Sequence, residues 1–265
     1  ESFAEQEIAV SRVETGPGAW RVTVYFDVVP DKKTLRALVA AAAGNDQVSA
    51  LRFESVAAKD WVAESLAGLQ PVSSGRFIVH GAHDRAKIPA NRVGIEIEAA
   101  LAFGTGHHGT TRGCLLALDG ICKITRKGRL RVLDLGTGTG VLAIAVARSL
   151  RARVLATDID GVSVRAAREN MRLNRVSSYV EARKADGVAS LHGRAPFDLV
   201  FANILLRPLQ RFATPLTKLV APGGCIILSG ILRSQANAVI AAYHGLVLER
   251  RIDIEGWTTL IMKKR

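Results

Sequence analysis

The sequence predicts an α/β protein whose main domain is a doubly wound, largely parallel sheet. Two observations lead to this fold class. From residue 130 onwards, apolar runs typical of buried strands alternate with segments typical of helices. The first run passes into a glycine-rich turn, Gly136–Gly140, and the second ends at Asp158. A glycine turn after one strand and a carboxylate after the next make half of a nucleoside-binding site in such sheets.

A smaller α+β domain is predicted before this sheet. Strands are expected at residues 7–14 and 19–28, followed by a helix that Asp31 caps and that ends near residue 43. A third strand is expected at residues 50–56. This order matches part of a ferredoxin-like module. We predict a small ferredoxin-like domain over residues 1–57, with its first strand upstream of residue 1 or absent.

The remaining elements are expected in a simple order. Residues 58–70 form a linker helix, which Pro71 ends, and residues 71–265 form the larger domain. Its strands are expected at 76–80, 93–98, 130–135, 153–158, 178–183, 198–202, 224–230, 246–254 and 257–263. Its first helix is expected at 111–122. Only Glu255-Gly256 joins the last two strands, so they form a hairpin and the final strand runs antiparallel to the sheet.

Composition excludes several classes of protein. Hydrophobic residues make up 48% and charged residues 23%, which is ordinary for a globular protein. No run of about 20 apolar residues is present, so no membrane span is expected. Three cysteines form neither an even disulfide set nor a close metal-binding spacing, which fits a reducing cytosol and predicts a cytoplasmic protein.

The net charge of +12 is distributed unevenly. Residues 1–70 carry seven basic and ten acidic side chains, whereas the remainder carries 29 basic and 14 acidic ones. A basic domain suggests nucleic acid or a ribonucleoprotein as a neighbour, and a solvated basic surface is the alternative. The run Lys123–Arg131, with Arg151 and Arg153, lies at the amino edge of the sheet. We interpret it first as a solvated edge and second as a weak RNA contact.

The glycine turn indicates which nucleoside binds. A dinucleotide site has the spacing G-x-G-x-x-G, but here the spacing is G-x-G-x-G and Val141 stands where the last glycine would fall. The run Asp134–Gly140 instead resembles motif I of the class I S-adenosylmethionine (SAM) methyltransferases. NAD(P) binding is the alternative. In the SAM family the loop lies under the cofactor, and Asp158 would hold its ribose hydroxyl groups.

Two further polar residues are expected at the same edge. Asp186 follows the third strand, where a carboxylate of the family often meets the adenine amino group; a turn or capping role is the alternative. Asn203 ends the fourth strand, at the position of motif IV in amino-methylating enzymes. Nucleobase enzymes continue there with two prolines and an aromatic residue that stacks on the base. Ile204-Leu205-Leu206 provides no such platform, so an aliphatic amine is the expected acceptor.

The segment Phe103–Thr111 contains the adjacent residues His107 and His108, but no third ligand lies close by in the sequence, so no metal site is expected. This segment, with Ile95–Ala102 before it, Asp134–Gly140 and Ala202–Leu205, closely resembles the bacterial ribosomal protein L11 methyltransferase family. Pro222–Gly224 and Ser229–Leu232 are similar as well.

The resemblance implies a SAM-dependent protein methyltransferase that modifies lysine ε-amino groups and the N-terminal α-amino group of that ribosomal protein. The small domain would bind the substrate, and we expect a monomer. The implied catalytic residue is Asn203, and the implied SAM contacts are Phe103, Thr111, Gly136, Gly138, Asp158, Asp186 and Asn203. Two alternatives remain, namely an RNA or DNA amino-methyltransferase and a non-catalytic ribosome assembly factor with a SAM-binding fold.

Overall fold

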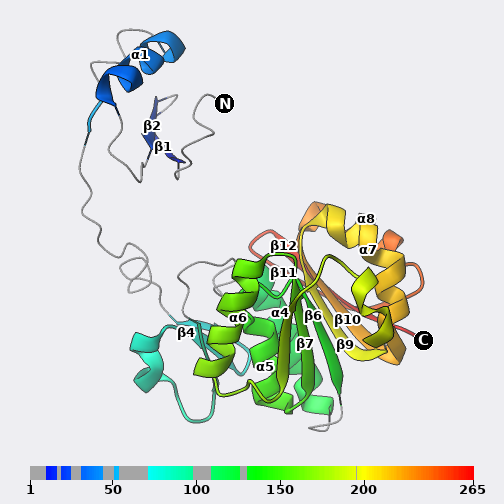
Figure 1. Cartoon of the computed structure of the whole chain (residues 1–265). Coiled ribbons are helices and arrows are strands. Elements are labelled where there is room, and N and C mark those ends of the chain that lie inside the picture. Colours follow the sequence, from blue (N-terminus) through cyan, green and yellow to red (C-terminus); the bar gives the residue numbers. More distant parts are fainter. Residues whose placement is uncertain are drawn as a thin grey trace. The chain divides into compact units, whose positions relative to one another are not determined.

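The computed structural model describes residues 10–16, 19–24, 31–43, 51–53, 71–97, 109–125, 130–194 and 196–265 (Figure 1). The chain divides into two compact units, Glu1–Lys59 and Asp60–Arg265. The predicted linker helix at 58–70 lies almost wholly outside the described residues.

The first unit contains a hairpin and a helix. Strands β1 (Val10–Gly16) and β2 (Ala19–Val24) pair antiparallel, and α1 spans Lys32–Ala43. Asp31 caps this helix as predicted, because its carboxylate accepts the backbone N–H of Lys33 at 3.0 Å. Residues 51–53 have no regular structure, so the strand predicted at 50–56 is wrong there. The ferredoxin-like arrangement stays a prediction.

The second unit is built on a seven-stranded sheet in the order β11-β12-β10-β9-β6-β7-β8. The strand bounds are β6 Arg131–Leu135, β7 Arg153–Asp158, β8 Val180–Lys184, β9 Phe197–Asn203, β10 Val220–Leu232, β11 Val247–Ile254 and β12 Trp257–Lys263. Strands β6 to β10 pair parallel, and β12 pairs antiparallel with both β10 and β11. The doubly wound sheet and its antiparallel last strand are therefore confirmed.

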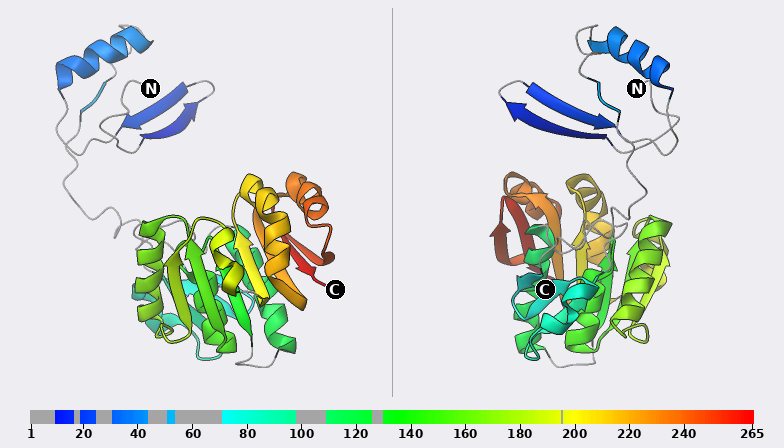
Figure 2. Two further views of the ribbon diagram at one scale, coloured as in Figure 1. Left: turned by 45° about the vertical axis from the view of Figure 1, so that its right-hand side comes forward. Right: turned by 90° about the vertical axis from the view of Figure 1, so that its left-hand side faces the viewer.

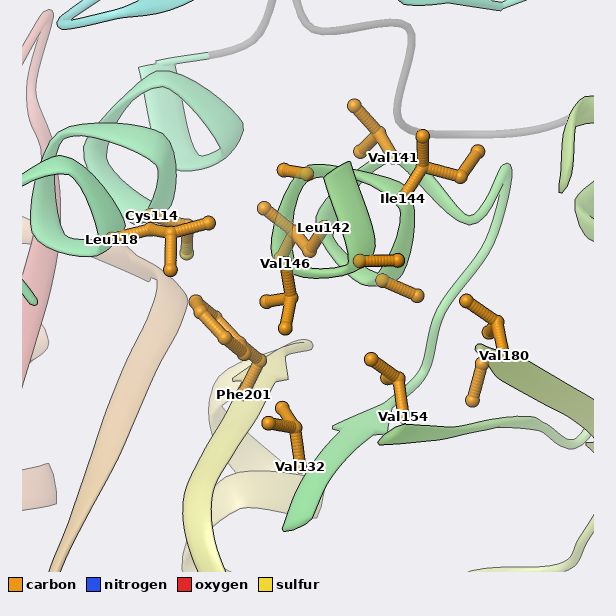
Figure 3. Packing of buried hydrophobic residues seen from close by; sticks show 14 of the residues in the cluster. Cys114, Leu118, Val132, Val141, Leu142, Ile144, Val146, Val154, Val180 and Phe201 are labelled. Carbon is orange, nitrogen blue, oxygen red and sulfur yellow. The ribbon is translucent and has the colours of Figure 1, made fainter. Parts of the chain in front are cut away.

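Helices cover both faces of this sheet (Figure 2). Alternate residues of the inner strands point to opposite faces and enter two separate cores. In β9, for example, Phe201 packs in the core that contains α4 (Gly109–Ile124), α5 (Val141–Leu150) and α6 (Gly161–Leu173). Figure 3 shows Phe201 with residues of α4 and α5 from this core. Its neighbour Val200 packs in the core that contains α7 (Leu206–Leu219) and α8 (Ala236–Ala242).

A second, three-stranded sheet precedes α4. It consists of β3 (Val72–Ser74), β4 (Phe77–His80) and β5 (Val93–Glu96). In the described part of the unit, short 3₁₀ helices also occur at Ala82–Lys87, Ala189–Arg194 and Arg233–Gln235. Strands β4 and β5 confirm the predictions at 76–80 and 93–98, whereas β3 was not predicted. The side chain of Asn174 fixes β5 to the end of α6, since it bonds both the N–H and the carbonyl of Glu96. Within the described ranges, no helix is both long and apolar enough to span a bilayer.

Candidate functional site

The candidate site lies at the carboxyl edge of the parallel strands, where the strand order reverses. Strand β6 lies between β7 and β9. Leu135 of β6 is paired with Ala202 of β9, so the next residues, Gly136 and Asn203, lie side by side at the ends of these strands. Asp158 ends β7 on the other side of β6. Ligands of doubly wound sheets bind at this kind of switch point.

Glycine is required in the turn after β6. Gly136, Gly138 and Gly140 have φ values of 73°, 53° and 83°, which side-chain-bearing residues seldom adopt. The backbone N–H groups of Gly136 and Thr137 both donate to the carbonyl of Thr157, at 2.8 and 2.9 Å. The turn is thereby fixed to β7 and presents bare backbone at the edge of the sheet.

The Asp158 carboxylate holds the same turn from the side. One of its oxygens accepts the backbone N–H of Gly138 at 2.9 Å, and the other accepts the N–H of Asp160 at 3.0 Å. Its main-chain carbonyl accepts the N–H of Ala185 at 2.9 Å. Because Asp186 follows directly and is exposed, the structure brings Asp186 to the edge that Asp158 occupies.

Asp134 connects the turn to the helix that follows it. Its buried carboxylate accepts the Thr137 hydroxyl at 2.6 Å and the backbone N–H of Ala143 in α5 at 3.2 Å. Burial raises the pKa of Asp134 to about 6, against the lowering effect of these two hydrogen bonds. Asp134 therefore positions the glycine turn from inside the protein rather than facing a ligand.

Replacing Asp134 by Asn is expected to flatten the pH dependence of stability. Between about pH 4 and pH 6 the folded state keeps a proton that the unfolded carboxyl has released, so the Asp134 contribution to stability falls as pH rises. Across that interval the loss is about 3 kcal/mol. One amide oxygen can accept both hydrogen bonds, because both end on the same carboxylate oxygen.

Urea unfolding of both proteins at about pH 4 and pH 7 measures this effect. Subtracting the free energy of unfolding of one protein from that of the other at each pH removes the contributions of all other titrating groups. The Asp134→Asn variant should gain stability relative to the unchanged protein as pH rises. Parallel pH profiles would contradict the assignment.

Ile204 is enclosed by two glycines, one in the turn after β6 and one in β10. A Cβ atom on Gly136 would lie 2.4 Å from Cγ2 of Ile204. A Cβ atom on Gly230 of β10, where φ is +85°, would lie 2.3 Å from the main-chain oxygen of Ile204. Asn203 immediately precedes Ile204, and its half-buried side chain has no hydrogen-bond partner among the described residues. The two glycines therefore fix the peptide next to the Asn203 amide.

The start of α4 approaches the site through Ser229. The Ser229 hydroxyl donates to the carbonyl of Thr110 at 3.2 Å, and Ser229 is the β10 partner of Asn203. Thr111, next in the helix, is only 1% exposed. The structure thus brings Thr111 near Asn203, although its side chain is largely enclosed.

Phe103, His107 and His108 lie outside the described residues. In the part of the chain that the structure describes, no three His, Cys, Asp or Glu side chains are grouped as a metal site.

Sequence reasoning missed two residues that shape the site. Asn170 of α6 is buried, and its amide donates to the carbonyl of Thr139 in the glycine turn at 2.9 Å. Gly230 belongs to a segment that carried the family resemblance, but no role followed from it. Neither contact has a sequence signal of its own, because each joins segments that are distant in the chain.

Comparisons with known proteins agree on one family. A model of the ribosomal protein L11 methyltransferase (PrmA) family matches residues 2–265. The ribosomal protein L11 methyltransferase of Rhodopseudomonas palustris (strain BisB5) is 56% identical, over 100% of this chain and 90% of that protein. The same-named protein of Bradyrhizobium diazoefficiens is 54% identical with the same coverage. The crystal structure of ribosomal protein L11 methylase from Lactobacillus delbrueckii subsp. bulgaricus has a TM-score of 0.66 at 28% identity, covering 74% of this chain and all of that one.

Proposed function

Because the chain belongs to the ribosomal protein L11 methyltransferase family, we propose that this SAM-dependent methyltransferase modifies ribosomal protein L11. The acceptors proposed are lysine ε-amino groups and the N-terminal α-amino group. The observation that carries the proposal is the site at the switch point, where a bare glycine turn, a carboxylate and the Asn203 amide meet. We also propose that the enzyme is a cytoplasmic monomer.

The described residues fit SAM. The left-handed glycines form a tight turn that carries no side chains at these positions, so a ligand can lie directly against its backbone. Asp158 retains oxygen lone pairs beside its two backbone donors and can accept ribose hydroxyl groups. We propose that Gly136, Gly138 and Asp158 hold the cofactor, and that Asp186 binds the adenine amino group. Phe103, Thr111 and Asn203 are proposed as further contacts.

SAM supplies a methyl group on a positively charged sulfonium centre. The acceptor amine must be neutral, yet a free lysine of pKa about 10.4 is deprotonated in only about one molecule in two thousand at neutral pH. Partial desolvation beside Ile204 and a nearby positive charge both lower the amine pKa. The side-chain and main-chain carbonyl oxygens of Asn203 would accept the amine N–H groups and direct its lone pair, so that positioning supplies much of the rate.

The first unit is proposed to recognise the substrate. We assign residues 1–57 to a ferredoxin-like substrate domain, 58–70 to a linker helix and 71–265 to the catalytic domain. The boundary between the two compact units, at Lys59 and Asp60, supports this division. The net charge of −3 over residues 1–70 suits a basic ribosomal protein.

Incubation with methyl-labelled SAM and, separately, with purified ribosomal protein L11 or protein-free ribosomal RNA tests this function. Label in the protein, on lysine and the terminal amine by mass spectrometry, supports it. Label in the RNA would favour a nucleic-acid amino-methyltransferase instead. An absence of label in both substrates, from a chain that binds SAM, would favour a non-catalytic assembly factor.

The variant Asn203→Ala is expected to lower kcat about 100-fold in this assay, because the amine loses the groups that orient it. The SAM dissociation constant should rise less than tenfold, since Asn203 is one contact among several. Gln210→Ala removes an exposed amide in α7 and serves as the control, with unchanged kcat. An unchanged kcat for Asn203→Ala would remove this residue from the mechanism.

A further inference from the structure

Arginines gather at the edge of the sheet opposite the candidate site. Arg131 and Arg153 are paired as the first residues of the parallel strands β6 and β7, and both are exposed. Arg194 lies beside them just before β9, and its main-chain carbonyl accepts a hydrogen bond from the Arg131 guanidinium. Side chains in register on adjacent parallel strands share a face, so these arginines form one local cluster.

The helices that return from the carboxyl edge enlarge the cluster. Helices α5 and α6 connect parallel strands, so their last turns reach the amino edge. Arg151 directly follows α5, and Arg172 and Arg175 lie at the end of α6, all three exposed. We call the whole set the arginine edge: Arg131, Arg151, Arg153, Arg172, Arg175 and Arg194.

The neighbouring carboxylates are already engaged. Glu181 of β8 forms ion pairs with Arg194, at 2.7 Å, and with Arg183, at 4.0 Å. Asp198 of β9 accepts the backbone N–H of Arg131, also at 2.7 Å. Among the described residues, the guanidinium groups of the other four members make no hydrogen bond or ion pair: Arg151, Arg153, Arg172 and Arg175. Several arginines elsewhere on this unit are paired with carboxylates, as Arg251 is with Asp253 at 2.9 Å. The arginine edge therefore keeps an uncompensated positive charge.

A hollow of about 320 Å³ opens within this edge. Its lining includes Arg131, Arg153, Arg194 and Glu181, the exposed residues Ser177 and Ser178, and the half-buried residue Tyr179. Guanidinium forks match phosphate oxygens in pairs, and serine hydroxyls add further donors. An aromatic ring beside them provides a surface on which a base or ribose can lie.

We propose that the arginine edge binds the phosphate backbone of an RNA strand. The hollow favours RNA over an anionic lipid surface, because a strand can place a nucleotide inside it whereas a bilayer meets only the outer charges. Binding there is independent of the methyl transfer, since the candidate site occupies the opposite edge of the same strands. The enzyme can therefore hold RNA and an acceptor protein together.

The test uses the full chain and a fluorescein-labelled RNA of about 20 nucleotides, with affinity followed by anisotropy from about 50 to 200 mM salt. The double variant Arg153→Glu with Arg175→Glu is compared with a matched reversal on the β10–β11 side, Arg233→Glu with Arg250→Glu. We expect the first pair to weaken binding at least tenfold at low salt and to reduce the slope of log K against log salt by about 1.4. The second pair should change binding less than threefold. Methylation of free L11 and thermal melting are measured on each protein, and Arg→Gln substitutions at the same positions provide a milder second pair.

Weakening confined to the Arg153 and Arg175 variants, with methylation and melting preserved, supports the proposal. Equal weakening by both double variants, or no binding of RNA by the unchanged protein, overturns it. Binding to vesicles containing phosphatidylglycerol without binding to RNA would also overturn it, in favour of a lipid surface. Full displacement of the RNA by about 10 mM inorganic phosphate would indicate that the arginine edge binds only a single phosphate group, which would contradict an extended RNA contact.

Discussion

Asp158→Ala is expected to weaken SAM binding at least about 100-fold. In the proposed complex this carboxylate accepts two ribose hydroxyl groups, and hydrogen bonds to a charged group contribute about 1.5–3 kcal/mol each. Losing both corresponds to about 3 kcal/mol or more, which is a factor of 100 or more in the dissociation constant. The substitution also releases the N–H of Gly138, which Asp158 accepts at 2.9 Å, so the turn loses one of its attachments.

Asp160→Ala is the matched control for this experiment. Asp160 lies two residues further along, where it caps α6 by accepting the N–H groups of Val162 and Ser163. Its loss should lower stability by about 1 kcal/mol and leave SAM affinity nearly unchanged. Isothermal titration calorimetry with urea unfolding on both variants separates the two effects. Comparable loss of SAM affinity in both would show that the region matters only through its folding.

Gly230→Ala is expected to damage both stability and catalysis. The new Cβ atom would stand 2.3 Å from the main-chain oxygen and 2.9 Å from the nitrogen of Ile204, at a φ of +85°. Backbone cannot move away as a side-chain tip can, so the Ile204 peptide and the adjoining Asn203 must shift. We expect a loss of about 3 kcal/mol or more, combining positive-φ strain with overpacking, and a fall in kcat of at least tenfold.

Gly223→Ala is the control that separates the backbone strain of a positive φ from the steric clash with Ile204. Gly223 also belongs to β10 and has a similar φ of +72°, but nothing lies within 4 Å of the Cβ position. This control should cost about 1 kcal/mol and leave kcat unchanged. Gly136→Ala should fall between the two, because its Cβ would meet the Cγ2 methyl of Ile204, a side-chain atom that can shift more easily than backbone. Urea unfolding and initial rates provide the comparison. Equal losses at positions 230 and 223 would remove the contact with Ile204 from the explanation.

The larger fold could be predicted because its signals are local. Apolar runs marked the core strands, and the two-residue link at Glu255-Gly256 required a hairpin and hence an antiparallel last strand. Strand β10 was predicted at 224–230 but extends from Val220 to Leu232. Pro222 and Gly223, residue types typical of turns, lie within the observed strand, and its pairing with β9 shifts register between Val220 and Cys225. Tertiary pairing overrode the local turn preference.

The site residues at strand ends could be predicted from the sequence, whereas the contacts between distant segments could not. The positions of Gly136, Asp158 and Asn203 follow from strand ends, which the sequence marks, and the sheet brings them to one edge. The contacts of Asn170 with Thr139 and of Gly230 with Ile204 depend on how a helix and a distant strand pack against the site. No local sequence pattern predicts them. The raised pKa of Asp134 likewise comes from burial, which spacing alone does not reveal.

The position of β12 in the sheet has a consequence for synthesis of the chain. Strand β11 is made first, yet it joins the sheet only through β12, which lies between β11 and β10. Until residues 257–263 have been translated, β10 has an open edge and β11 has no partner in this sheet. Chains fold from the N-terminus as they emerge. A nascent chain can therefore complete the glycine turn early, but the finished sheet must wait for its last strand to be inserted.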